Sequence, residues 1–180
     1  LKCCKKYKTK HLIAASSSSV YGETKKSVRE NSNTNNPLQF YAATKKSNEM
    51  MAHSFSSIYK LPITMLRLFT VYGPWGRPDM ALYNFCKNIL LKKKIFLFNR
   101  GNHKRDFTYI DDLTNSIKNI IRYLDNKKHA KNFEIINFCS QRSVTLKKYI
   151  EIIENNLKIK AKKKLLPLQQ GDMIKTHGSS

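Results

Sequence analysis

The chain has 180 residues, of which 41% are hydrophobic and 26% are charged, and its formal net charge is +22. Its length and composition are those of a single folded domain with a hydrophobic core, which excludes collagen-like and disordered chains. So high a charge is typical of proteins that bind nucleic acid or an anionic membrane, but the lysines are spread along the chain, and neither a nucleic-acid motif nor an apolar stretch of ~20 residues accompanies them. We therefore predict no specific nucleic-acid partner and no membrane partner.

The cysteines and histidines give no sign of a metal site. The four cysteines stand at positions 3, 4, 86 and 139, without the C-x-x-C pair of zinc or redox sites, and the five histidines are scattered singly. Thiols stay free in a reducing compartment, so a cytoplasmic protein without a metal is expected.

The first predicted element is a buried strand that opens into four serines. It is the short apolar run His11–Ala15. A polar segment over residues 23–37 predicts a surface loop. Apolar residues at helical spacing then predict a helix from about Tyr41 to Tyr59, which ends before Pro62.

A second strand follows and leads into a turn-rich loop. The strand is predicted over Ile63–Phe69 and the loop over Val71–Pro78, and loops that follow strands often hold the ligands of α/β proteins. The alternation of strand and helix predicts an α/β fold, a single domain with a parallel or mixed sheet. The remaining predicted elements are a helix at Met80–Leu91, a strand at Ile95–Phe98, a helix at Ile110–Leu124, a strand at Phe133–Phe138 and a helix at Leu146–Leu157.

A tyrosine and a lysine stand four residues apart near the start of the first predicted helix. Tyr41 and Lys45 therefore share one face of that helix. An ammonium beside a phenol favours the phenolate, which makes tyrosine a usable general base, although a solvated chance pair is the alternative. The hydroxyls of Ser16–Ser19 can share the proton that moves in a carbonyl/alcohol interconversion, with an ordinary serine-rich loop as the alternative.

Four ordered blocks resemble the NAD-dependent epimerase/dehydratase family of extended short-chain dehydrogenases. Within that family, Phe69–Asp79 resembles the UDP-glucuronate 4-epimerases in particular. The resemblance implies the C-terminal part of a Rossmann-like doubly wound sheet over about residues 1–75, intertwined with a small α/β substrate-binding region over about residues 76–180. The blocks are Ala15–Gly22, Tyr41–Lys46, Arg67–Ala81 and Lys104–Asp112.

The resemblance implies NAD as cofactor and a UDP-sugar as substrate. Tyr41 would take the proton of the sugar 4-hydroxyl while hydride passes to NAD, and Lys45 would hold the nicotinamide ribose together with Tyr41 and Ser16. The 4-keto sugar would rotate and be reduced on its other face, which converts UDP-glucuronate into UDP-galacturonate. Ser17 would hydrogen-bond the reacting oxygen, although Ser18 and Ser19 are close enough in sequence to compete.

The resemblance also implies a substrate-binding set of Ser18, Thr70, Arg77 and Arg105. Thr70 and Arg77 would lie beside the sugar carboxylate, which a hydroxyl and a guanidinium suit. Arg105 would pair with the pyrophosphate, with a local ion pair to Asp106 as the alternative. Related dehydratases and decarboxylases carry an acidic residue where this chain has serines, which favours simple epimerisation.

The sequence departs from the family pattern at both ends. None of its six glycines stands in the glycine-rich turn that cradles a dinucleotide. Leu166–Met173 resembles a late substrate-binding segment, but the helix expected after it is missing. We therefore expect a truncated chain, either part of an epimerase whose other parts are supplied elsewhere or a degraded and inactive product. An intact enzyme is expected to form a homodimer.

Overall fold

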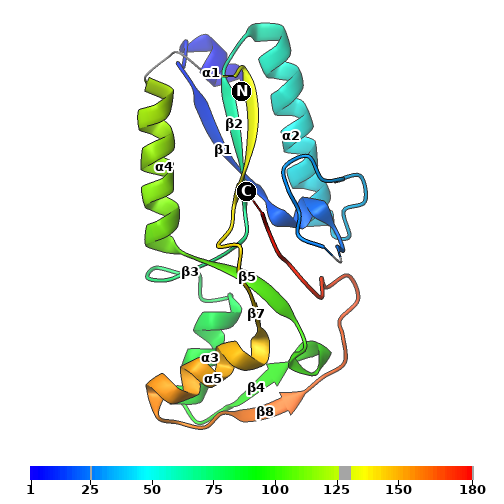
Figure 1. The fold of residues 1–180 in the computed structure, drawn as a ribbon, viewed down its shortest axis with the longest axis vertical. Helices are drawn as coiled ribbons and strands as arrows, with labels where there is room; N and C mark the ends of the chain where they lie inside the picture. The colour runs from blue at the N-terminus through cyan, green and yellow to red at the C-terminus, as the bar shows by residue number, and fades with distance from the viewer. Residues whose placement is uncertain (25, 126–130, 180) are drawn as a thin grey trace.

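The computed structural model describes residues 1–24, 26–125 and 131–179, which form an α/β fold of two lobes (Figure 1). The upper lobe holds a parallel sheet in the order β1-β2-β6, with a helix on each side. The lower lobe holds a parallel strand pair beneath two helices, and a mixed sheet in the order β3-β5-β7 lies between the lobes.

The elements have the following bounds. The strands are β1 (Leu12–Ser17), β2 (Ile63–Leu68), β3 (Thr70–Tyr72), β4 (Lys94–Leu97), β5 (Lys104–Tyr109), β6 (Phe133–Phe138), β7 (Ser143–Thr145) and β8 (Lys162–Leu165). The helices are α1 (Lys2–Lys6), α2 (Phe40–Tyr59), α3 (Ala81–Leu90), α4 (Ile110–Asp125) and α5 (Leu146–Leu157), with short 3-10 turns η1 (Ser18–Tyr21) and η2 (Phe98–Gly101).

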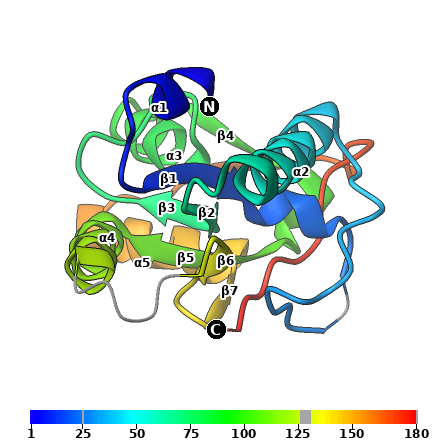
Figure 2. The same cartoon turned by 90° about the horizontal axis from the view of Figure 1, so that it is seen from above.

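The upper sheet is covered on both faces, and its central strand β2 is buried for that reason. Ile63 and Met65 pack with Ala52 of α2 on one face. Leu66 packs with Leu113 of α4 on the other. Figure 2 shows the two helices on opposite sides of the sheet. A strand that packs on both faces tends to be apolar on both, and β2 is mostly apolar in the sequence, with Thr64 and Arg67 as its polar members.

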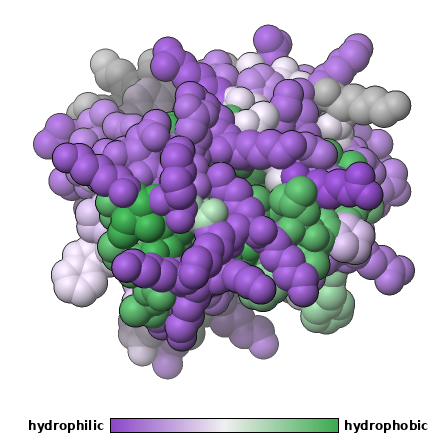
Figure 3. All heavy atoms as spheres, turned by 90° about the horizontal axis from the view of Figure 1, so that it is seen from below, coloured by the Kyte–Doolittle hydropathy of each residue, from purple (hydrophilic) through white to green (hydrophobic). Residues whose placement is uncertain are grey.

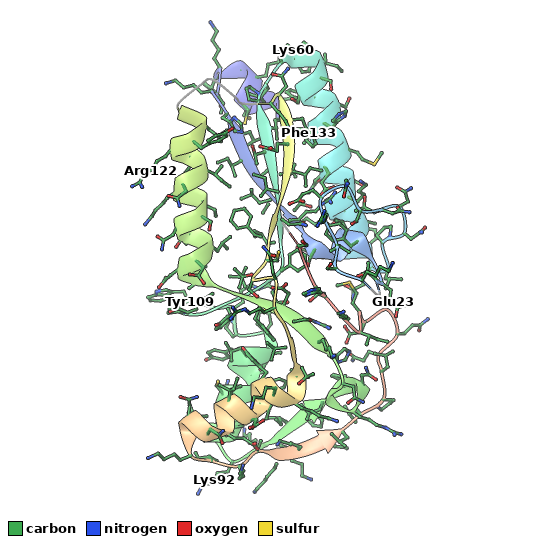
Figure 4. The ribbon with its side chains drawn as sticks, in the orientation of Figure 1. Glu23, Lys60, Lys92, Tyr109, Arg122 and Phe133 are labelled. Atoms are coloured by element: carbon green, nitrogen blue, oxygen red, sulfur yellow. The ribbon has the colours of Figure 1, made fainter. Side chains whose placement is uncertain are left out.

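The lower lobe has a separate apolar core. Phe85 and Ile89 of α3 pack against Ile95 and Leu97 of β4 and against Ile150 of α5. The chain passes from this lobe back to the upper one through β5 and α4, and Tyr109 marks the junction (Figure 4). The candidate site lies where the two lobes meet.

The predicted alternation of strand and helix is confirmed. The strand at Phe133–Phe138 and the helix at Leu146–Leu157 have the bounds that the sequence predicted. The loop prediction is wrong for Val71 and Tyr72, which belong to β3, because they pair with β5 over a long sequence separation. Strand β8 was not predicted, since all four of its residues are exposed and carry no apolar pattern.

The chain crosses between the lobes more than once. Helix α4 and strand β6 lie in the upper lobe although they follow the lower-lobe elements α3 and β4. The region predicted to bind substrate, about residues 76–180, therefore contributes to both lobes. The division near residue 75 stays a prediction.

Two of the lysine runs come together in the lower lobe. The parallel pairing of β4 and β8 sets Lys94 opposite Lys162, and Lys92 lies at the far end of the molecule (Figure 4). Hydrophilic side chains surround the apolar patches on this lower face (Figure 3).

The part of the chain that the structure describes contains no helix whose length and apolar character would suit a bilayer crossing. The absence of a nucleic-acid partner stays a prediction.

The C-terminal segment, residues 177–179, forms hydrogen bonds with two distant parts of the chain. The amide of Val28 donates to the carbonyl of His177 at 3.0 Å, and the amide of Ser179 donates to the carbonyl of Val28 at 2.9 Å. The amide of Gly178 donates to Asp106 Oδ2 at 3.2 Å. These bonds hold the segment between the loop before α2 and strand β5.

Replacing Gly178 by alanine is expected to lower the free energy of unfolding by about 1–3 kcal/mol, the usual cost of overpacking. A Cβ at this position would lie 2.5 Å from Cys139 Sγ and 2.7 Å from Phe69 Cζ. Chemical denaturation measures the change. Ser179→Ala is the control, because its backbone bonds survive the substitution. If the two variants are equally stable, the segment is not packed against Cys139.

Candidate active site

A cavity of about 840 Å³ lies between the end of β1, the start of α2, β3 and the lower lobe. It brings together residues that are far apart in the sequence, and clefts of this size are typical small-molecule sites. Six of the eight predicted site residues line it, namely Ser16, Ser17, Tyr41, Lys45, Thr70 and Arg77.

The first turns of α2 carry the tyrosine and the lysine on the side that faces β1. Lys45 Nζ donates a hydrogen bond to the carbonyl oxygen of Ala15 at 3.0 Å, so the ammonium bridges from the helix to the serine strand. The same nitrogen lies 5.8 Å from the centroid of the Tyr41 ring. Tyr41 is 52% exposed, so its phenol is open to a ligand in the cavity.

The four serines at the end of β1 have different surroundings. Ser16 and Ser17 line the cavity, whereas Ser18 and Ser19 are buried outside it. Ser17 caps η1, and its Oγ accepts from the amide of Ser19 at 3.2 Å and from the Ser19 hydroxyl at 2.9 Å. Because Ser17 accepts in both bonds, its own hydroxyl hydrogen can be donated to a ligand oxygen.

Ser16 is oriented by a different contact. Its hydroxyl donates to Glu49 Oε1 at 2.6 Å, and both residues are buried. The hydroxyl is therefore engaged with α2, although Ser16 contributes to the cavity wall. Glu49 was not predicted as a site residue, because its partners Ser16 and Arg67 are far from it in the sequence.

Thr70 and Arg77 line the same cavity from later parts of the chain. Thr70 begins β3, and Arg77 lies in the loop before α3, with its Nη2 3.3 Å from Asp79 Oδ2. Both side chains of this pair are largely exposed, and exposed pairs contribute little stability, so an anionic ligand can compete for the guanidinium. Trp75, in the same loop, is fully exposed and lines the cavity mouth.

Arg105 lies outside the cavity lining and has a partner that the sequence analysis did not predict. Its Nη2 donates to Asp172 Oδ1 at 3.1 Å, so the alternative of a local pair with Asp106 is wrong. Asp106 instead accepts from the amide and hydroxyl of Ser140, each at 2.8 Å. Burial lowers the pKa of Arg105, and Asp172 partly opposes that shift.

His103 completes a small cluster with Asp172. Its Nε2 lies 3.0 Å from Asp172 Oδ2, without the alignment of a hydrogen bond. Burial lowers the pKa of His103, while the carboxylate of Asp172 raises it and Arg105 lowers it further. Nothing in the sequence set His103 apart, because its partner follows about seventy residues later. Over the described residues, no three metal-binding side chains gather, and the metal-free site stays a prediction.

The sequence profile of the NAD dependent epimerase/dehydratase family matches residues 1–137, well over half of the chain. The chain belongs to the NAD-dependent epimerase/dehydratase family. The resemblance seen in the four sequence blocks is therefore confirmed, and the parallel sheet of the upper lobe is Rossmann-like.

Several members of the family are similar over almost the whole chain. A probable UDP-glucuronate 4-epimerase of Rhizobium meliloti is 39% identical over 99% of this chain, which covers 57% of that protein. UDP-glucuronate 4-epimerase 5 of Arabidopsis thaliana is 44% identical over 93% of this chain, which covers 41% of that protein. The chain therefore spans roughly half the length of these relatives.

A solved structure of the family shows the same arrangement. The UDP-glucuronic acid 4-epimerase of Bacillus cereus, in complex with UDP-glucuronic acid and NAD, superposes with a TM-score of 0.89 at 35% identity. The match covers 99% of this chain and 55% of that one.

Proposed function

We propose that this chain forms the acid/base and sugar-binding part of an NAD-dependent nucleotide-sugar epimerase that inverts C4 of UDP-glucuronate. One observation carries the proposal: a single cavity is lined by Ser17, Tyr41 and Lys45 together with Thr70 and Arg77. The UDP-glucuronate epimerases among its relatives support the choice of substrate.

Three side chains would handle the proton at the 4-hydroxyl. The Tyr41 phenol would accept it when the alcohol is oxidised and return it when the ketone is reduced. Ser17 would donate a hydrogen bond to the same oxygen and hold it against the phenol. The Lys45 ammonium lies beside the Tyr41 ring, with its Nζ 5.8 Å from the ring centroid.

The residues present fit the nicotinamide end of NAD. The Lys45 ammonium, held at the end of β1 by the Ala15 carbonyl, has further N–H donors for ribose hydroxyls, and Tyr41 lies beside it. Ser16 would contribute to the same wall. When bound, NAD supplies a reversible acceptor for the hydrogen on C4. These 180 residues contain no glycine-rich turn for the pyrophosphate of the dinucleotide.

Thr70 and Arg77 would select the sugar carboxylate, since a hydroxyl and a guanidinium both donate to it. Arg105 would bind the pyrophosphate, and the negative charge of the phosphates would compete with Asp172 for its guanidinium. Ser18 is the weakest member of the set, because it is buried outside the cavity.

Simple epimerisation is favoured over loss of water or carbon dioxide. No aspartate or glutamate is present among the described residues that line the cavity. Dehydration and decarboxylation need a further acid or base beside the tyrosine. A dehydratase or decarboxylase relative is therefore the less favoured function. The homodimer and the cytoplasmic location stay predictions.

Binding of UDP-glucuronate is expected to change the fluorescence of Trp75. This residue is the chain's one tryptophan, and it is fully exposed at the cavity mouth. Removal of the indole from water on ligand binding should shift its emission to shorter wavelength, with half-saturation on the order of 1 μM to 1 mM. Titration of the chain with UDP-glucuronate measures the change.

Calorimetry on Trp75→Phe provides the control, because the heat of binding should persist when the fluorescence signal is gone. A degraded product would bind neither UDP-glucuronate nor NAD. Absence of both heat and emission change would therefore favour that alternative and contradict the proposal.

A further inference from the structure

A buried polar network crosses the upper sheet directly behind the cavity. Ser16, Arg67 and Asn137 occupy the same level of β1, β2 and β6, because Ser16 pairs in register with Arg67 and Arg67 with Asn137. Ser16 and Arg67 point toward α2, where they contact Glu49. None of these four side chains is more than 5% exposed.

Glu49 and Arg67 form the centre of the network. Arg67 Nε donates to Glu49 Oε1 at 2.8 Å and Arg67 Nη2 donates to Glu49 Oε2 at 2.8 Å, the parallel two-bond geometry that fixes both side chains. The Ser16 hydroxyl adds a third donor to the carboxylate at 2.6 Å. The remaining donor of Arg67, Nη1, bonds Tyr21 Oη and the carbonyl of Glu30, each at 2.9 Å.

The position of Glu49 on α2 relates this network to the site. Tyr41, Lys45 and Glu49 follow one another at four-residue intervals, so they lie in one row along the helix. Lys45 is tied to Ala15 and Glu49 to Ser16, which are consecutive residues of β1. These two hydrogen bonds to adjacent residues of β1 fix both the rotation and the axial position of α2 relative to the strand that carries Ser17.

We propose that the Glu49–Arg67 pair acts as a positioning device that sets the register between α2 and β1, and with it the placement of Tyr41 and Lys45 opposite Ser17. Neither residue lines the cavity, so neither touches a ligand there. This inference rests on the proposed function, because that function gives Tyr41 and Lys45 their roles. The relative position of α2 and β1 can nevertheless be measured without substrate or cofactor.

The test replaces the pair by apolar residues of similar size. Removing one partner alone would leave a buried charge, whereas replacing both is often neutral for stability. The variant Glu49→Met with Arg67→Met should therefore keep a melting temperature near that of the unchanged chain. If the pair served stability alone, the double variant would differ from the unchanged chain in no other property.

The measured quantity is the rate at which an amine-acylating reagent modifies Lys45. Mass spectrometry of the peptide that contains Lys45 determines this rate. Loss of the register should release Lys45 Nζ from the Ala15 carbonyl and raise its acylation rate about fivefold, the factor expected for one ordinary hydrogen bond. Lys148, on α5 in the other lobe, serves as the internal reference.

Glu154→Gln is the matched control variant. Glu154 is also a buried carboxylate that accepts from a lysine, with Lys163 Nζ at 2.9 Å, but it lies in the lower lobe. This variant should leave the Lys45 rate unchanged. If the double variant fails to fold, Ser16→Ala replaces it, because it removes the hydrogen bond that joins Glu49 to β1 and leaves the buried ion pair intact.

An unchanged Lys45 rate in a folded variant would overturn the positioning role. Failure of the chain to bind UDP-glucuronate would instead count against the proposed function, and would leave the acylation result standing. Where turnover is measured, misplacement of Tyr41 should lower kcat and leave KM nearly unchanged.

Discussion

Replacing Tyr41 by phenylalanine is expected to lower the rate of epimerisation roughly 10²–10⁴-fold, the usual contribution of a positioned acid/base group. Phenylalanine keeps the ring that lies beside Lys45 but has no hydroxyl to accept the proton of the sugar alcohol. Incubation with NAD and UDP-glucuronate, followed by chromatographic separation of the UDP-sugars, measures the rate. Binding of UDP-glucuronate should change little.

Tyr83→Phe is the matched control for this prediction. Tyr83 lines the same cavity from α3 and is similarly exposed, but it lies in the other lobe, away from Lys45 and the serines. Its variant should keep a rate close to that of the unchanged protein. Equal losses in the two variants would mean that the cavity tolerates neither change, and Tyr41 would lose its special role.

Replacing Arg67 by alanine is expected to lower the free energy of unfolding by roughly 3–5 kcal/mol, because one partner of a buried ion pair is removed. Glu49 would remain as a buried carboxylate without its two strongest donors. Chemical denaturation measures the loss. Arg122→Ala, on the exposed end of α4 (Figure 4), should stay within about 0.5 kcal/mol and serves as the control.

The same pair should make stability depend on pH. Burial by itself raises the pKa of Glu49, but the hydrogen bonds from Arg67 and Ser16 outweigh it, and the pKa lies below the ordinary value of 4.5. A lowered pKa stabilises the fold above the unfolded-state value, and this contribution is lost as the pH falls below 4.5. Arg67→Ala should therefore flatten the acid side of the stability curve. An unchanged acid side would contradict the pairing.

Sequence patterns predicted the long elements and missed the short polar ones. The mostly apolar run Ile63–Leu68 is recognisable because both of its faces are buried. The strands β5 and β7 carry many polar residues, and β5 is held by pairing with β3 on one side and with β7 on the other, where Lys104 lies opposite Thr145. Such pairing depends on residues far along the chain, so local patterns do not predict it.

The candidate site shows the same division. Spacing along a helix was enough to put Tyr41 and Lys45 on one face, and motif resemblance was enough to select Thr70 and Arg77. The choice among the serines needed the three-dimensional contacts, because only the geometry of η1 decides that Ser17 lines the cavity and Ser18 does not. The partner of Arg105 could also be identified only from three-dimensional contacts, since Asp172 lies 67 positions later in the sequence.

By itself, the sequence determined the α/β class, the family and the chemical groups available to the site, because these follow from local periodicity and from short ordered motifs. The tertiary structure alone decided which of these groups share one cavity and that Glu49, Arg67 and Ser16 meet behind it. Contacts between β1, α2 and β2 join residues 18 to 51 positions apart, and no local pattern encodes them.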